Sequence, residues 1–463
     1  MKIKFCGAAR EVTGSSHLLT LDSGFTILLD CGLYQGRSAD MENFNQTWLF
    51  DPSQLDCLLL SHAHIDHCGR IPALVRDGFR GTIFCTHATR HLAALLMTDS
   101  AKIQEYDAEY QQKKGFKNAK PLYTQRDAAQ ALRQFASYGY ETPFQIADGS
   151  VEVLFRDAGH ILGSASITLN VKEKEKTTRL GFSGDIGRPN RPILRNPLPL
   201  PDVDFLICES TYGDKDHLSA PNEDDHFLEI IRHTCIDKKG KVIIPAFGVG
   251  RVQEIVYTLD RLQTAGKLPK LPVYVDSPLA VSATEIFNAH PECFDQDLSN
   301  YLRSDGDPFG MNSVHYIRET NDSKQLNSNP APCVIISPSG MMNAGRVQHH
   351  LSNNIENPRA TILIVGYCAP HTPGGELLNG AKEIFILGQK KSVRADVELM
   401  SSFSAHGDRH EMLEVIRNQQ KTLKKLFLVH GEYETQQAFS SFLSENGFQC
   451  PIEIPALGEE VNL

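Results

Sequence analysis

The sequence lacks any long apolar run. No stretch of its 463 residues approaches the roughly 18 consecutive apolar residues that cross a bilayer. It also lacks Cys-x-x-Cys pairs, and its 11 cysteines, an odd number, favour reduced thiols over a disulfide framework. The opening basic residues break at Gly7 without leading into the apolar core of a signal peptide. We therefore expect a cytoplasmic protein that has no part in a membrane.

A basic excess is missing as well. The formal net charge of −10 argues against a protein coated in phosphate-binding lysines. It does not exclude nucleic acid as a substrate, because a local basic groove and metal ions attract phosphate to an acidic protein. The stretch Gly248-Val249-Gly250 lacks the third glycine of a dinucleotide fingerprint, so we expect no nucleotide cofactor. The remaining composition is that of a soluble globular protein that is too long for one ordinary core.

The hydrophobic pattern changes twice along the chain. Short apolar or alternating runs open it, and helices are expected over residues 91–112 and 127–138. From about residue 209, continuous apolar strands such as 241–245 and 361–366 alternate with helical segments, which is typical of a parallel sheet covered on both faces. Near residue 395 shorter elements return, including a strand expected at 397–400.

These changes predict one domain interrupted by another. We expect residues 1–208 to form the first part of the outer domain, residues 209–395 to form the insert, and residues 396–463 to complete the outer domain. Short strands belong to the outer domain, and the parallel sheet belongs to the insert.

The stretch Ser61-His62-Ala63-His64-Ile65-Asp66-His67 gathers ligand-type side chains just after an apolar run. If that run is a buried strand, a turn at its end can direct His62 and His64 toward one metal ion, and Asp66 and His67 toward a second. Imidazole nitrogen and carboxylate oxygen are ligands of Zn²⁺. Without a cation, such dense placement invites mutual repulsion. The spacing therefore predicts a metal centre rather than a solvated polar loop.

Other ionisable residues follow predicted strands, each beside glycine or another small residue. A single histidine in such a place is more often a packed or surface residue. Repetition in segment after segment is what a site at one edge of a sheet sandwich requires. The residues concerned are Asp30, His160, Asp185, His406 and His430.

This combination resembles the metallo-β-lactamase superfamily and, within it, the β-CASP group of nucleic-acid-processing hydrolases. The motif His62-x-His64-x-Asp66-His67 specifies only the superfamily, whereas Glu209, the insert and the late pair His406 and His430 narrow it to β-CASP. The most similar members are stand-alone prokaryotic relatives of the cleavage and polyadenylation specificity factor nuclease subunit. The resemblance implies an α/β fold, an αββα sandwich with an inserted β-CASP domain whose parallel sheet is flanked by helices.

The resemblance also implies two zinc ions per chain, with Mn²⁺ as the alternative. The ligands implied for the first ion are His62, His64, His160 and Asp185. Those implied for the second are Asp66, His67, His430 and again Asp185, which bridges the two. Asp30 is expected to orient a ligand imidazole without binding metal.

Two such ions would lower the pKa of a bridging water, so that hydroxide exists at neutral pH for an in-line displacement at phosphorus. The leaving ribose oxygen needs a proton, for which His406, oriented by Glu209, is the candidate general acid. Asp66 is counted with these two as catalytic.

A weaker resemblance concerns contacts to phosphate. The residues Ser337, Ser339 and Gly340 match the family's strand-to-helix turn near the scissile phosphate, where backbone N–H groups suit an anion. Family members often carry arginine where this chain has Gly375-Glu376, and Arg346 or Arg251 are the candidates to replace it.

The leading hypothesis is a zinc-dependent ribonuclease that hydrolyses phosphodiester bonds of single-stranded RNA. Endonuclease and 5′-to-3′ exonuclease action both stay open, because they use the same metals and acid. The alternative enzyme is a small-molecule hydrolase of lactones, thioesters or lactams, which would need neither Glu209 with His406 nor the insert. A catalytically silent RNA-binding scaffold is disfavoured because every expected ligand position is filled. A homodimer is implied by the resemblance alone.

Overall fold

The computed structural model describes residues 1–36, 40–217, 223–268, 270–304, 307–310, 314–366, 368, 372–400 and 405–463. The chain divides into two compact units: unit 1 comprises Met1–Asp216 and Ala405–Leu463, and unit 2 comprises His217–Ser404. Both boundaries lie later than the positions expected from the sequence. After Glu209 the chain still packs on unit 1, where the Ser210 hydroxyl donates to the Val429 carbonyl at 2.7 Å.

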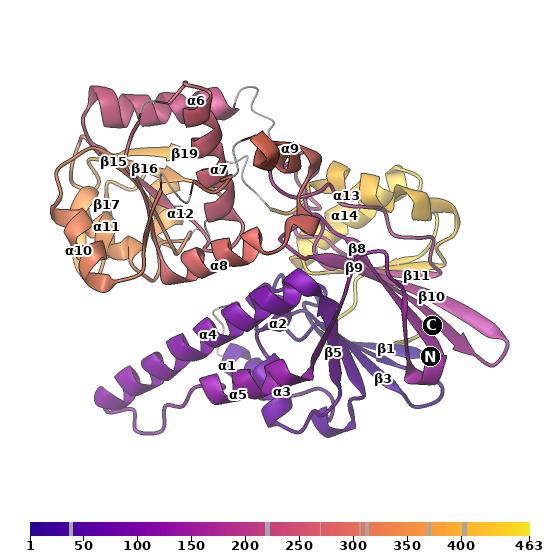
Figure 1. Ribbon diagram of the computed structural model, residues 1–463. Coiled ribbons are helices and arrows are strands. Elements are labelled where there is room, and N and C mark those ends of the chain that lie inside the picture. Colours follow the sequence, from indigo (N-terminus) through magenta and orange to yellow (C-terminus); the bar gives the residue numbers. More distant parts are fainter. Residues whose placement is uncertain are drawn as a thin grey trace. The chain divides into compact units, whose positions relative to one another are not determined.

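Two seven-stranded sheets form unit 1 (Figure 1). The first sheet has the order β22-β1-β2-β3-β4-β5-β6 and the second β21-β20-β11-β10-β9-β8-β7. In chain order the strands of the first sheet are β1 (Lys2–Gly7), β2 (Ser16–Thr20), β3 (Thr26–Leu29), β4 (Cys57–Leu59), β5 (Thr82–Thr86), β6 (Phe135–Tyr138) and β22 (Glu460–Asn462). Those of the second are β7 (Phe144–Ile146), β8 (Val151–Asp157), β9 (Ala165–Glu173), β10 (Lys176–Phe182), β11 (Phe205–Glu209), β20 (Lys425–Val429) and β21 (Ile452–Glu453).

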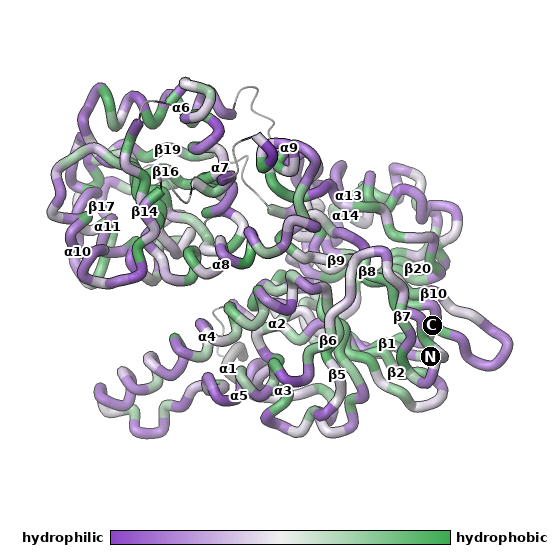
Figure 2. Tube along the Cα trace, in the orientation of Figure 1, coloured by the Kyte–Doolittle hydropathy of each residue, from purple (hydrophilic) through white to green (hydrophobic). Residues whose placement is uncertain are grey.

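The two sheets share one hydrophobic core. Alternate residues such as Ile3 and Phe5 of β1 pack in the same buried cluster as Val153 of β8 and Phe427 of β20. This alternation is the sequence signature of strands that bury one face. Figure 2 shows the apolar residues concentrated along these strands.

Helices cover the sheets of unit 1. They are α1 (Asp40–Gln46), α2 (Ile65–Cys68), α3 (Ile71–Arg76), α4 (His87–Lys113), α5 (Gln125–Ala131), α13 (Arg409–Ile416) and α14 (Tyr433–Glu445). Met412 of α13 and Phe439 of α14 pack on Leu206 and Leu428, which point away from the shared core. Unit 1 is therefore the expected αββα sandwich.

One predicted helix is wrong in its second half. We expected a helix over 127–138, but α5 ends at Ala131, and Phe135–Tyr138 forms β6, which pairs in parallel with β5. Pairing with the sheet edge overrides a local helical pattern, because strand formation depends on neighbours that lie far away in sequence.

Unit 2 contains a six-stranded sheet of the order β14-β13-β15-β12-β16-β19, in which all the strand pairs are parallel. Its strands are β12 (Lys241–Pro245), β13 (Val273–Asp276), β14 (Val314–Ile317), β15 (Cys333–Ser337), β16 (Thr361–Ile364) and β19 (Asp396–Leu399), beside a hairpin of β17 (Glu383–Ile386) and β18 (Gln389–Ser392). Its helices are α6 (Glu223–Ile231), α7 (Arg251–Thr264), α8 (Pro278–Asn288), α9 (Gln296–Ser304), α10 (Thr320–Ser328), α11 (Val347–Asn354) and α12 (Pro373–Leu378).

The parallel sheet confirms the expectation drawn from continuous apolar strands. Connections run in both directions from the middle of the sheet, so right-handed crossovers place helices on both faces. The strand expected at 397–400, which we had assigned to the outer domain, is β19 at the edge of this sheet. Its pairing with β16 explains why unit 2 extends past residue 395.

All 11 cysteines are free in the structure; ten are buried and Cys450 is partly buried. In the described parts of the chain, none of the helices is both long and apolar enough to span a membrane.

Candidate metal centre

The predicted ligand cluster begins where β4 ends. The chain turns after Leu59, His64 precedes the first turn of α2, and Asp66 and His67 lie on that helix. A neighbouring loop crosses so close that a Cβ on Gly32 would lie 1.6 Å from the Asp66 carbonyl oxygen. Glycine at position 32 therefore allows the loop to approach the ligand-bearing turn.

The remaining residues of the site come from the second sheet. β10, β11 and β20 are parallel neighbours, and β8 runs in the same direction. Strands that run in one direction end at one edge of their sheet. His160, Asp185 and His430 follow three of these strands, and Glu209 ends the fourth. The structure thus brings these residues to the edge where the His62–His67 turn lies.

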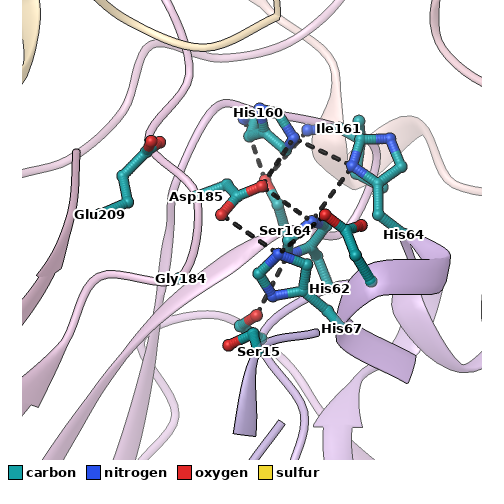
Figure 3. A network of polar contacts seen from close by, with 12 residues as sticks. Ser15, His62, His64, His67, His160, Ile161, Ser164, Gly184, Asp185 and Glu209 are labelled. Atoms are coloured by element: carbon teal, nitrogen blue, oxygen red, sulfur yellow. Dashed lines mark hydrogen bonds and ion pairs between the residues drawn. The ribbon is translucent and has the colours of Figure 1, made fainter. Parts of the chain in front are cut away.

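One group of potential ligands consists of His62, His64, His160 and Asp185. Nδ1 of His64 lies 3.2 Å from Nε2 of His62 and 3.1 Å from Nε2 of His160. Both Nε2 atoms face Oδ2 of Asp185, at 3.4 Å and 3.5 Å. Figure 3 shows His62 and His160 facing this carboxylate, and His64 joined to both rings.

A second group consists of Asp66, His67 and His430. Nε2 of His67 and Nε2 of His430 lie 3.1 Å apart, and the latter is 3.4 Å from Oδ2 of Asp66. Oδ1 of Asp185 lies 3.2 Å from His67 Nε2 and 3.7 Å from His430 Nε2. The two oxygens of Asp185 therefore face different groups.

The ring nitrogens that face away from these groups are held by other residues. His67 Nδ1 lies 2.7 Å from Oδ2 of Asp30, a fully buried residue whose positive φ of 58° is tolerated by aspartate. The other contacts are His62 Nδ1 to the Ser61 hydroxyl at 3.0 Å, His160 Nδ1 to the Ala405 carbonyl at 3.3 Å, and His430 Nδ1 to the Thr211 hydroxyl at 3.0 Å. Such contacts fix ring orientation in metal sites.

The protonation states of three of these imidazoles suit metal ligands. Burial lowers the pKa of His62 and His160, and it lowers that of His64 to about 3, so these three rings stay neutral. Burial also opposes charge on His67, but the carboxylates of Asp185 and Asp30 outweigh it and raise the pKa of that ring well above its usual value. A neutral imidazole keeps the lone pair that binds a metal.

An orphaned oxygen supports the presence of a cation. Oδ1 of Asp185 is buried and accepts no hydrogen bond from the described residues, although His67 Nε2 is nearby. Two nitrogens bound tetrahedrally to one Zn²⁺ at about 2.0–2.1 Å would lie roughly 3.3 Å apart. The observed ring separations of 3.1–3.2 Å are close to that value. The donor set and its spacing therefore fit bound metal.

His406 and Glu209 form a pair beside these groups. Nδ1 of His406 lies 3.1 Å from Oε1 of Glu209, and Nε2 lies 3.9 Å from Oδ2 of Asp185. Burial would lower the pKa of His406, but Glu209 and Asp185 raise it to about 9. The loop that carries the ring is fixed to the Asp185 loop, because the Gly407 N–H donates to the Ile186 carbonyl at 2.9 Å.

Glu209 also lies close enough to Asp185 and His430 to form a third potential ligand group. Its oxygens are already used, however. Oε1 accepts the Ile186 N–H at 2.6 Å, and Oε2 accepts the Thr211 N–H at 3.2 Å. We therefore interpret Glu209 as a partner of His406 rather than as a ligand.

Comparison with known proteins agrees with this architecture. Residues 9–224 match the model of the metallo-beta-lactamase superfamily, residues 252–377 match the Beta-Casp domain, and residues 390–455 match the Zn-dependent metallo-hydrolase RNA specificity domain. Ribonuclease TTHA0252 of Thermus thermophilus is 34% identical over 462 residues, which cover 100% of both chains. This chain belongs to the β-CASP group of the metallo-β-lactamase superfamily.

Archaeal relatives of this β-CASP chain carry two different names. The RNase J-like protein of Methanocaldococcus jannaschii is 31% identical over 459 residues, 98% of each chain. Transcription termination factor FttA of Methanosarcina mazei is 30% identical over 442 residues, which are 93% of this chain and 67% of that protein. These names describe the relatives themselves.

The residues predicted to contact phosphate lie in unit 2 of the β-CASP chain. Ser337 is fully buried, and its hydroxyl donates to the Asp276 carbonyl at 3.1 Å. The Ser339 hydroxyl donates to Oδ1 of Asn343 at 2.9 Å, and Gly340 is buried. The turn does not lead directly into a helix, since α11 begins only at Val347. This differs from the strand-to-helix turn that we expected.

The two arginines that we considered as replacement phosphate ligands are paired within unit 2. Arg346 lies 2.7 Å from Oδ1 of Asp276 and also donates to the Arg318 carbonyl, and Arg251 pairs with Glu254. Both guanidinium groups are therefore paired with carboxylates and are not open to phosphate.

Sequence reasoning missed Ser61 and Thr211, whose hydroxyls orient His62 and His430. Ser61 directly precedes the cluster, and Thr211 stands two residues after Glu209. A hydroxyl residue beside a ligand or a strand-end acid is the signal that could have indicated them.

Proposed function

We propose that this β-CASP protein is a metal-dependent ribonuclease that hydrolyses phosphodiester bonds of single-stranded RNA. The observation that carries the proposal is the His406–Glu209 pair beside the His and Asp groups. A thiolate leaves a thioester without being protonated, whereas expulsion of a ribose oxygen needs an acid such as His406 oriented in this way. End-to-end similarity to a protein named as a ribonuclease supports the same choice.

Two Zn²⁺ ions per chain are the proposed occupants, since neutral imidazoles and carboxylates are typical zinc ligands; Mn²⁺ is the alternative. His62, His64 and His160 would hold the first ion, and Asp66, His67 and His430 the second. Asp185 would bridge them, because its two oxygens face different groups. When bound, the ions would activate water and neutralise charge on the phosphate.

The proposed role of the remaining residues is proton transfer and orientation. In hydrolysis, a water oxygen adds to phosphorus as the water loses a proton to solvent, the bond from phosphorus to the ribose oxygen breaks, and that oxygen takes up a proton. His406 would donate this proton from Nε2, because Nδ1 faces Glu209. Asp30 would hold His67 in the orientation that directs Nε2 into the site. Ser339 and Gly340 remain proposed contacts for phosphate, and a homodimer remains a prediction from family likeness.

The test is digestion of a 5′-monophosphorylated, 3′-labelled single-stranded RNA by wild type and His406→Ala, with a lactam and a thioester assayed in parallel. The matched control is His410→Ala, in the same segment but with a ring 59% exposed. We expect His410→Ala to cut like wild type and His406→Ala to be at least about 100-fold slower, as loss of a general acid predicts. The fragment pattern separates endonuclease from exonuclease action.

Consumption of the lactam or thioester while RNA survives would replace the ribonuclease proposal with small-molecule hydrolysis. RNA binding without any cleavage by the metal-loaded protein would favour the scaffold instead. Metal analysis of protein purified without added metal tests the choice of zinc, which dominance of another ion would overturn.

A further inference from the structure

Helix α4 starts beside the loop that follows His160. Its N-terminal cap, the Thr86 hydroxyl, donates to the Gly163 carbonyl at 2.6 Å, and Thr89 donates to the same oxygen at 2.8 Å. Gly163 lies three residues after His160. From this anchor the helix runs 27 residues, and its far half extends beyond the sheets of unit 1 (Figure 1). We call residues 101–120 the α4 arm.

The α4 arm exposes large apolar side chains along one face. Ile103, Tyr106 and Tyr110 follow the i, i+3, i+7 spacing that aligns residues on a helix. They are 53%, 68% and 49% exposed, and Phe116, just past the helix end, is 67% exposed. Folding of unit 1 does not account for these four side chains, because they remain largely outside its core.

The far end of the α4 arm is basic, although the protein as a whole is acidic; over residues 101–120, five lysines stand against Glu105, Asp107 and Glu109. Residues 110–126 contain four lysines and one arginine and no aspartate or glutamate. All four of these lysines belong to the arm and are exposed, namely Lys113, Lys114, Lys117 and Lys120. Within the described chain, none of these four ammonium groups forms an ion pair, and Lys114 lies over the Tyr110 ring at 4.5 Å. Charge of this sign is complementary to phosphate.

The end of the α4 arm is ordered by its own hydrogen bonds. Gly115, at a φ of 102°, lets the helix end, and the Phe116 N–H returns to the Gln111 carbonyl at 3.1 Å. Gln112 reaches the Ala119 carbonyl at 2.7 Å, and the hydroxyl of the buried Tyr123 bonds Ser100 at 2.9 Å. The rings are therefore presented on a preorganised support, which lowers the entropic cost of binding.

We propose that the α4 arm is an RNA-binding surface, on which single-stranded substrate stacks its bases at a distance from the point of cleavage. The inference rests on the proposed ribonuclease function. Aromatic rings combined with exposed lysines are the features that bind single strands without regard to sequence. Tyr106 and Tyr110 are separated by four residues, about 6 Å along the axis. That exceeds the about 3.4 Å rise per nucleotide of a duplex strand, so the pair suits unstacked bases.

The position of the rings predicts a length requirement. Tyr106 lies 19 residues after His87, or about 28 Å along the helix. A strand with the about 3.4 Å rise of a duplex needs about eight nucleotides to cover that distance, and an extended strand needs fewer. Only RNA that continues several nucleotides beyond the scissile phosphate would reach the rings.

The experiment compares cleavage of a long and a short RNA by the full-length, metal-loaded protein. The variants are Tyr106→Ala/Tyr110→Ala, the ring-preserving Tyr106→Phe/Tyr110→Phe, and Phe385→Ala as a control with an equally exposed ring on unit 2. Stacking is worth at least about fivefold in affinity per base. We expect the double alanine variant to raise KM for an oligomer of about 20 nucleotides at least about 25-fold. Its kcat, and all constants for an oligomer of about five nucleotides, should stay as in wild type.

Two further readouts localise the binding surface. RNA containing 4-thiouridine should form photo-crosslinks to peptides of the α4 arm in wild type. Changing Lys113, Lys114 and Lys117 to Gln should flatten the dependence of log KM on log salt by about 0.7 for each phosphate that these lysines neutralise in wild type. The phenylalanine variant and Phe385→Ala should retain the wild-type KM.

The possible failures are distinguishable. If wild type cuts no RNA, the proposed function fails and this inference fails with it. If wild type cuts RNA and the alanine variant shows the same KM for the long oligomer, the α4 arm is not an RNA-binding surface, although the ribonuclease proposal stands. If the variant changes only the sedimentation coefficient, the exposed rings serve a protein interface and the inference is overturned.

Discussion

Replacing Glu209 by Gln tests whether the residue supports proton donation by His406 rather than metal binding or folding. The fully buried carboxylate accepts three donors, namely the Ile186 N–H at 2.6 Å, the Thr211 N–H at 3.2 Å and His406 Nδ1 at 3.1 Å. An amide has only one acceptor oxygen, so at least one donor loses its partner. If the amide nitrogen faces Thr211, the carbonyl can still hold His406, but without a negative charge.

The expected loss follows from the strength of that hydrogen bond. A hydrogen bond to a charged group contributes about 1.5–3 kcal/mol, and one to a neutral group about 0.5–1.5 kcal/mol. The difference of about 1–2 kcal/mol, together with poorer orientation of the ring, predicts a kcat on RNA lower by about 10- to 100-fold. His406→Ala should lose more, about 100- to 10,000-fold. The double variant should be no slower than His406→Ala, because Glu209 acts through His406.

The assay pairs RNA with bis(p-nitrophenyl) phosphate. p-Nitrophenolate leaves without being protonated, whereas a ribose oxygen needs a proton in order to leave. We expect both single variants to cleave the activated ester at nearly the wild-type rate while they fail on RNA. An equal loss on both substrates would refute the reasoning, because it would mean that Glu209 and His406 support metal binding or folding instead of donating a proton.

Three other perturbations follow from the structure. Removing metal with a chelator should abolish cleavage and lower the unfolding temperature, since closely spaced imidazoles and carboxylates lose the cation that offsets their desolvation; an unchanged melting curve would contradict this. Burial raises the pKa of Asp157 to about 7, above the about 3.9 of an unfolded chain. Between these values the folded state holds a proton that the unfolded state lacks, so stability falls by about 4 kcal/mol as pH rises from about 4 to about 7. Asp157→Asn keeps an oxygen for the Gly159 N–H, bonded at 2.9 Å in the wild type. The variant should resist urea better than wild type at about pH 8 and equally at about pH 4, and a pH-independent difference would count against this account. Asp276→Asn should destabilise unit 2 by about 3–5 kcal/mol, because the fully buried carboxylate lies 2.7 Å from Arg346 and 2.6 Å from His350; a two-state urea midpoint equal to that of wild type would disprove it.

The ligand-type residues could be found from sequence because their chemistry is unusual. Four such residues between His62 and His67 have no simple packing explanation, and the structure places all of them in two compact groups. The parallel sheet of unit 2 could also be predicted from the sequence, since strands such as Val242–Ile244 are apolar throughout and buried on both faces.

Other features depend on contacts that sequence spacing does not reveal. Thr211 is an ordinary hydroxyl residue until the fold brings it to His430. Phe135–Tyr138 forms a strand only because β5 offers an edge. Ser337 reads as an exposed turn residue, yet the hydroxyl is directed inward by a carbonyl of the neighbouring strand. In each case a partner distant in sequence decides the outcome.

The insertion of unit 2 between β11 and β20 delays completion of the metal centre during translation. These strands pair in register from Phe205 with Lys425 to Glu209 with Val429, although the whole of unit 2 is translated between them. The 188 residues from 217 to 404 take about 10–40 s to synthesise at about 5–20 residues per second. During that time the nascent chain carries the His62–His67 turn but neither His406 nor His430. An enzyme that cuts RNA would therefore lack part of its metal centre until unit 2 and β20 had both been translated.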